Sequence, residues 1–107
     1  MDKIDDIEFG IILPKYDNSM RKINPELHEK IAKEMSERFG GVTIIPSVLG
    51  CWVDEKRNKL VCEENAMFLS VRDTESVSGD VRRTIEEDRK FMENLGKKPE
   101  SYSIKPQ

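Results

Sequence analysis

Asp88 is the side chain whose position in the sequence points most directly to chemistry. On a helix of 100° per residue, it falls near the centre of an apolar stripe made of Val81, Ile85, Met92 and Leu95. A carboxylate held among apolar groups has a raised pKa and can act as a general base or bind a ligand. The alternative, which we favour, is a structural carboxylate that reaches solvent or pairs with an arginine such as Arg72.

His28 is the only histidine and the second candidate for a catalytic role. It follows Leu27 in the first turn of a predicted helix, where the positive helix end lowers the pKa of an imidazole and favours its neutral form. No cysteine or carboxylate lies at the spacing of a metal site, so we expect neither a metal nor a cofactor. A partly buried or exposed histidine with a structural role is the favoured alternative.

Trp52, Glu63 and Glu64 occupy two adjacent predicted strands and are candidates for a ligand pocket with one aromatic wall and two carboxylates. Tyr16 and Arg21 lie in the loop before the first predicted helix, and they would close the mouth of this pocket. In the competing interpretation, which we favour, Trp52 anchors a core or a dimer interface. The glutamates are then solvated strand residues.

Cys51 and Cys62 lie directly opposite each other if the predicted hairpin folds symmetrically about Lys56 and Arg57. Opposed residues have Cβ atoms about 4.5 to 5.5 Å apart, which is close to the spacing that a disulfide needs. A redox-sensitive link between the strands is therefore one interpretation. The favoured interpretation is a pair of reduced cysteines packed as small apolar residues.

Composition limits the classes of protein to consider. The length of 107 residues predicts a single domain, residues 1–107, with flexible ends at 1–5 and 106–107. Its 18 basic and 21 acidic residues are interspersed and leave a net charge of −3, which argues against a general nucleic-acid binder. No long apolar run follows the acidic N-terminus, so we expect no membrane span, no signal peptide and a cytoplasmic location.

The first half of the chain predicts a strand and a helix. Apolar residues alternate with other residues over 7–13, which is the pattern of a strand. Asn24 can cap a helix over residues 25–39, and Gly40 can end it in a left-handed conformation. The apolar stripe of this helix leaves Arg38 among the residues predicted to face water.

The middle and the end of the chain predict a hairpin, a helix and a last strand. Residues 42–53 and 60–72 carry alternating apolar residues around a polar turn, and Pro46 and Gly50 indicate a bulge or bend. A second helix is predicted to begin near residues 78–80 and to end at Leu95, before Gly96. A short strand over residues 101–105 would complete the sheet.

This order of elements predicts an α+β fold of the ferredoxin-like βαββαβ type, with a four-stranded antiparallel sheet and two helices on one face. The hairpin is apolar on both faces over much of its length, which a sheet covered on only one side does not require. We therefore expect a homodimer in which two sheets pack face to face.

The segments Gly41-Val42-Thr43, Gly50-Cys51-Trp52, Lys59-Leu60-Val61 and Glu63-Glu64 resemble a pattern in a family of small prokaryotic proteins. In that pattern a helix is followed by G-V-T, then G-x-W, and then a strand with E-E or E-P. The resemblance covers about residues 40–71. It implies a ferredoxin-like fold and brings no assigned reaction.

Two functions follow from these features. The first is a small-molecule-binding protein or cofactor-independent enzyme, with a pocket between the sheet and helices of a homodimer and with Asp88, His28 and Trp52 in the site. The second is a structural or protein-interaction module without pocket chemistry, which binds through an exposed sheet face or hairpin edge.

Overall fold

The sheet of this protein has three antiparallel strands. The computed structural model describes residues 6–17 and 19–103. Strand β3 (Lys59–Arg72) lies in the middle, between β1 (Ile7–Pro14) and β2 (Thr43–Asp54), so the strand order is β1-β3-β2. Ile11 of β1 and Ile44 of β2 both pair with Phe68 of β3. The predicted hairpin is confirmed, and Cys51 pairs with Cys62 as expected.

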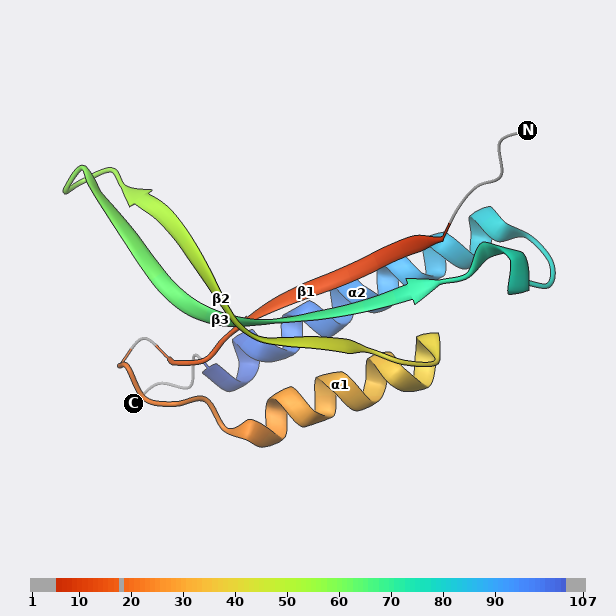
Figure 1. Cartoon of the computed structure of the whole chain (residues 1–107), viewed down its shortest axis with the longest axis horizontal. Coiled ribbons are helices and arrows are strands. Elements are labelled where there is room, and N and C mark those ends of the chain that lie inside the picture. The colour runs from red at the N-terminus through yellow and green to blue at the C-terminus, as the bar shows by residue number, and fades with distance from the viewer. Residues whose placement is uncertain (1–5, 18, 104–107) are drawn as a thin grey trace.

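Both helices lie on the same side of the sheet (Figure 1). Helix α1 (Pro25–Phe39) packs against β3, and α2 (Val81–Ser103) packs against β1. The limits of α1 agree with the prediction, because Asn24 and Gly40 cap its two ends as expected. The Asn24 side chain accepts a hydrogen bond of 2.9 Å from the Glu26 amide, and Gly40 closes the helix with a φ of 92°.

Helix α2 begins as expected and ends later than expected. The Asp80 side chain accepts hydrogen bonds of 3.0 Å from the Arg82 amide and 3.4 Å from the Arg83 amide, which caps the first turn. Gly96 does not end the helix. A Cβ on Gly96 would lie 3.8 Å from the Ile11 side chain, an ordinary packing distance, so this position of α2 faces β1.

The ferredoxin-like prediction of four strands is wrong for the described residues, whose sheet has three. Of the predicted last strand, residues 101–103 belong to α2 and residues 104–105 lie outside the described part of the chain. The prediction rested on only two alternating apolar residues, Tyr102 and Ile104. Such a short pattern does not distinguish a strand from the next turn of a helix.

The core lies between the helices and the helix-facing side of β1 and β3. Its buried apolar residues are Leu13, Ile23, Leu27, Ile31, Met35, Ala66, Phe68 and Leu95. They come from both helices, two strands and the loop before α1. Alternation along β1 and β3 directs Ile12, Met67, Leu69 and Val71 to the opposite face of the sheet.

The outer part of the β2–β3 hairpin projects beyond the rest of the sheet. Because β1 ends at Pro14, opposite Asn65, residues 49–54 and 59–64 form a two-stranded ladder that β1 does not join. We call these two segments the arm. Figure 1 shows the arm rising away from the side of the sheet that carries the helices. A register shift between Ile45 and Val48 separates the arm from the three-stranded part, which confirms the irregularity predicted near Pro46.

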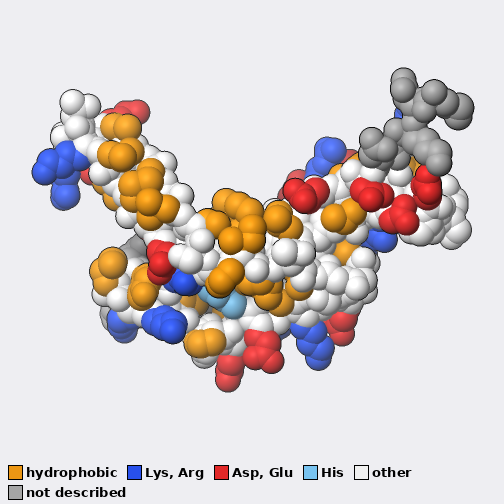
Figure 2. All heavy atoms as spheres, viewed as in Figure 1, with side chains coloured by type: hydrophobic (Ala, Val, Ile, Leu, Met, Phe, Trp, Pro, Cys, Tyr) orange, Lys and Arg blue, Asp and Glu red, His pale blue; other side chains and the backbone are white. Residues whose placement is uncertain are grey.

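The side of the sheet without helices is apolar. We call it the free face, and it is formed by Ile12, Ile45, Met67, Leu69 and Val71. Figure 2 shows hydrophobic side chains gathered above the middle of the sheet and along the arm. Gly10 leaves room for the Leu69 side chain on this face, since a Cβ at position 10 would lie 2.8 Å from that side chain.

Within the described residues, no helix is both long enough and apolar enough to cross a membrane.

Candidate functional site

Asp88 is completely buried and carries two arginine partners. Its Oδ1 accepts hydrogen bonds from Arg38 Nε at 2.9 Å and from Arg72 Nη2 at 2.8 Å. Its Oδ2 accepts a bond of 2.8 Å from Arg72 Nε. The pairing with Arg72 named in the sequence analysis is confirmed, and the prediction that Arg38 faces water is wrong.

The two arginines are also held by aromatic rings. The guanidinium carbon of Arg38 lies 5.2 Å from the centre of the Phe91 ring, and that of Arg72 lies 5.1 Å from the centre of the Phe39 ring. Each cation therefore contacts both a ring face and the shared carboxylate. This arrangement joins α1, β3 and α2 at one end of the core.

The ionisation of Asp88 follows from these contacts. Burial raises the pKa of its carboxyl, but hydrogen bonds from Arg72 and Arg38 outweigh burial and hold the pKa below its ordinary value. The same contact raises the pKa of the Arg72 guanidinium. A carboxylate with a low pKa and both oxygens occupied is a poor general base. The geometry thus favours a structural role for Asp88.

His28 lies at the other end of α1 and is half-buried. Its ring meets Phe68 edge to face with ring centres 5.6 Å apart. Its Nε2 lies 3.3 Å from the Pro14 carbonyl oxygen. Because a carbonyl only accepts, Nε2 is the donor in this bond. His28 also lines a pocket between α1 and the sheet.

The two catalytic candidates do not share a site. Arg38, which binds Asp88, follows His28 by ten residues in α1, a distance of about 15 Å along the helix axis. A substrate of modest size would not contact both. The structure therefore gives no support to a reaction in which Asp88 and His28 act together.

The residues predicted to form an aromatic and acidic pocket point in different directions. Trp52 is half-exposed on the arm, opposite Val61. Glu63 and Glu64 are neighbours on β3, so their side chains lie on opposite faces. Glu64 accepts a hydrogen bond of 2.9 Å from Ser47 Oγ and pairs with a lysine at the base of the arm.

Tyr16 and Arg21 lie in the loop before α1, and hydrogen bonds to the Asp17 side chain stabilise this loop. The Asp17 Oδ1 accepts bonds of 2.9 Å from the Arg21 amide and 2.8 Å from the Ser19 amide, and the Arg21 amide bond is the main cause of a lowered pKa of Asp17. Arg21 Nε donates to Asp17 Oδ2 at 3.1 Å. Arg21 is thus engaged in the turn, and Tyr16 is exposed.

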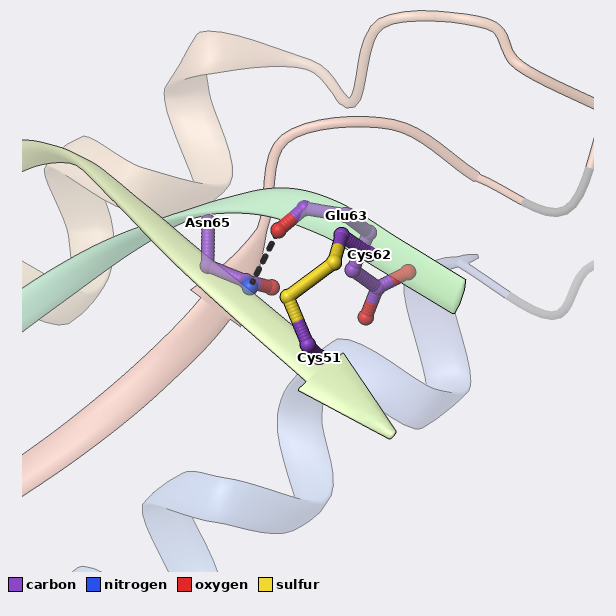
Figure 3. The surroundings of a disulfide bond; sticks show 4 residues. All are labelled: Cys51, Cys62, Glu63 and Asn65. Atoms are coloured by element: carbon purple, nitrogen blue, oxygen red, sulfur yellow. Dashed lines mark hydrogen bonds between the residues drawn. A yellow bond between two sulfur atoms is a disulfide. The ribbon is translucent and has the colours of Figure 1, made fainter. Parts of the chain in front are cut away.

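Cys51 and Cys62 face each other across the arm, as predicted, and form a disulfide (Figure 3). The reduced state favoured in the sequence analysis is not the one in the structure. Next to the disulfide, the buried Asn65 side chain donates to the Glu63 carbonyl oxygen at 3.2 Å. A Cβ on Gly50 would lie 2.9 Å from the Asn65 amide nitrogen, so glycine leaves room for Asn65.

Reduction of the disulfide is expected to loosen the arm and leave the core unchanged. A two-stranded hairpin is marginal by itself, and a link that closes a loop of this length contributes about 3 kcal/mol in the chain-entropy model. Amide hydrogen exchange at Trp52 and Val61 should therefore accelerate up to about 100-fold after addition of dithiothreitol. Exchange at Phe68 is the internal control. Equal exchange in the arm before and after reduction would contradict this expectation.

Sequence reasoning missed two sets of residues. Arg38 follows Met35 of the apolar stripe by three positions, and this spacing places Arg38 at the border of the buried side of α1. Ile44 and Pro46 line the pocket beside His28 because α1 does not cover them. The alternation of residues along a strand does not predict where a helix lies over the sheet.

Comparisons with known proteins leave the family open. No protein-family model matches the chain, and neither the curated proteins nor the solved structures include a match. The resemblance to the small prokaryotic family stays a prediction. Among the described residues, no group of three or more histidine, cysteine, aspartate or glutamate side chains is arranged to hold a metal ion.

Proposed function

We propose that this chain is a protein-interaction module that forms a homodimer through its free face. The observation that carries this proposal is the exposure of three large apolar side chains on the uncovered side of the sheet. Ile12 is 55% exposed, Ile45 is 37% exposed and Val71 is 43% exposed. A contiguous apolar patch of this kind is typical of a surface that another protein covers.

The surface area of the chain supports a partner of considerable size. The chain exposes 8054 Å², whereas a compact monomer of 12.4 kDa exposes about 6,100 Å². Its radius of gyration is 16.4 Å, against about 13 Å for a compact domain of this length. A standard protein interface covers about 800 Å² on each partner. The excess belongs to the whole elongated chain, the arm included, and its area is larger than one such interface covers.

A second copy of the chain suits the charge of the free face. In a two-fold interface the same patch meets itself, so charges of one sign near its centre would repel. In the three-stranded part of the sheet, the positions of the free face carry one charged residue, Glu8, which pairs with Val71 near the end of the sheet. Two such faces can pack about 10 Å apart as stacked sheets do.

Catalysis is not part of this proposal, because the negative charge of the leading candidate, Asp88, is balanced by Arg38 and Arg72. The proposal also includes no nucleic-acid partner.

A cytoplasmic location remains a prediction. Disulfides are uncommon in the reducing cytoplasm, so thiol labelling of Cys51 and Cys62 in rapidly quenched cells would test that location.

Ile44 and Ile45 provide a matched pair of variants for testing the homodimer. They are adjacent in β2, have similar exposure and point to opposite faces. Ile45→Lys would place a charge in the proposed interface without a partner, and we expect it to raise the dimer dissociation constant at least about 100-fold. Ile44→Lys should leave the dimer intact.

Molar mass by light scattering at micromolar concentration is the measurement. The wild type and Ile44→Lys should show twice the chain mass of 12.4 kDa, and Ile45→Lys should show the chain mass itself. Circular dichroism would verify that both variants are folded. A monomeric wild type, or a dimer that survives Ile45→Lys, would refute the proposed interface.

A further inference from the structure

A pocket of about 370 Å³ lies between α1 and the β2–β3 pair. Its apolar lining comes from three elements: Ala32 in α1, Ile44 and Pro46 in β2, and Ala66 and Phe68 in β3. Ala66 and Phe68 are buried core residues, so the deepest part of the pocket borders the core. The volume is within the usual range of small-molecule sites, which is about 300 to 1,000 Å³.

The pocket exists because the helices do not cover the whole sheet. Ile44 pairs with Phe68 and points to the side that carries the helices, yet it is 47% exposed. Helix α1 packs on β3, and β2 makes its main contacts with β3. The register shift after Ile45 then turns β2 away at Pro46. An apolar strip of β2 beside α1 is left without a covering side chain.

The rim of the pocket is polar, but the charge of its lysine is balanced by a nearby carboxylate. Lys15 Nζ lies 3.6 Å from Glu64 Oε1, so the lysine charge is already paired. Glu29, the other charged residue of the lining, is exposed to solvent. His28 Nε2 donates to the Pro14 carbonyl oxygen, so this nitrogen is already engaged.

We propose that this pocket binds a small uncharged aromatic molecule of one or two rings. The apolar lining removes the ring from water, and the paired lysine offers no unmatched charge to an anion. His28 already meets Phe68 edge to face in the pocket wall, and a ligand ring can pack against the same aromatic and aliphatic side chains. The site is on the opposite side of the sheet from the free face, so it is independent of the proposed homodimer.

Titration of isotope-labelled protein with three related probes tests this inference. Indole is the uncharged ring, indole-3-acetate adds a negative charge, and tryptamine adds a positive charge. Indole should shift the NMR signals of Ala32, Ile44 and Ala66. Ile44→Lys should weaken indole binding about tenfold or more, whereas Ile45→Lys should leave it unchanged.

Each alternative outcome overturns a defined part of the inference. Shifts confined to Ile12 and Val71 would place the aromatic molecule on the free face, and no saturable shift would remove the pocket as a site. Tenfold tighter binding of indole-3-acetate or of tryptamine would show that the site selects a charged ligand. Because Ile44→Lys is expected to remain dimeric, loss of indole binding in this variant is distinguishable from failure of the homodimer.

Discussion

Replacing Asp88 with asparagine is expected to lower the free energy of unfolding by about 3 kcal/mol. The substitution keeps the shape of the side chain but leaves Arg38 and Arg72 without their shared counter-charge. Removing one member of a buried ion pair costs about 3 to 5 kcal/mol, and the lower value applies because both arginines keep some contact with solvent. The corresponding decrease in melting temperature is about 12 to 24 °C.

Urea unfolding followed by circular dichroism would measure this loss. Glu87→Gln is the matched control, since it also neutralises a carboxylate of α2 that pairs with an arginine. Its partner, Arg83, is 3.6 Å away on the exposed surface of the same helix. Exposed pairs of this kind contribute less than about 1 kcal/mol. Equal effects of the two substitutions would show that the Asp88 cluster is not a structural centre.

The pH dependence of the free energy of unfolding should reflect the ion pairs between Asp88 and the two arginines. The folded state holds the pKa of Asp88 below its ordinary value, whereas the unfolded chain has a pKa of about 3.9. The contribution of Asp88 is therefore fully present above the unfolded pKa and is lost as pH falls through the folded pKa. Stability of the wild type should decrease more steeply than that of Asp88→Asn below about pH 4.

Replacing Phe68 with alanine is expected to cost about 3 to 5 kcal/mol. Phe68 is 1% exposed, contacts the His28 ring and pairs with strands on both sides. The substitution removes a large apolar side chain from the centre of the core and leaves a cavity next to the pocket. Chemical unfolding would measure the change.

Leu60→Ala is the control for Phe68→Ala, because both residues belong to β3 and lie on the same side of that strand. Leu60 is 68% exposed in the arm. Truncation there should change the free energy of unfolding by less than about 0.5 kcal/mol. A large effect of Leu60→Ala would mean that the arm is covered by another part of the protein.

Local signals in the sequence were sufficient for the first helix and for the hairpin. Asn24, Pro25 and Gly40 act through their own backbone geometry, so the limits of α1 do not depend on distant contacts. The pairing of Cys51 with Cys62 follows from the length of the turn between them. Both features were therefore predictable without knowledge of the tertiary structure.

Tertiary contacts decided the features that were predicted wrongly. Gly96 has the same residue type as Gly40, but it lies inside α2 on the side that faces Ile11 and does not end its helix. The direction of the Arg38 side chain depends on Asp88, which is far away in the sequence. The pocket beside His28 depends on the position of α1 relative to β2. None of these follows from residue type or periodicity alone.

The most direct test of the homodimer is an NMR sample that mixes isotope-labelled and unlabelled chains. Isotope-filtered spectra report only contacts between different copies. The proposed interface predicts nuclear Overhauser effects between methyl groups of Ile12, Ile45 and Val71 in one chain and free-face methyl groups in another. Intermolecular contacts that involve only Leu49 and Leu60 of the arm, or none at millimolar concentration, would contradict the proposal.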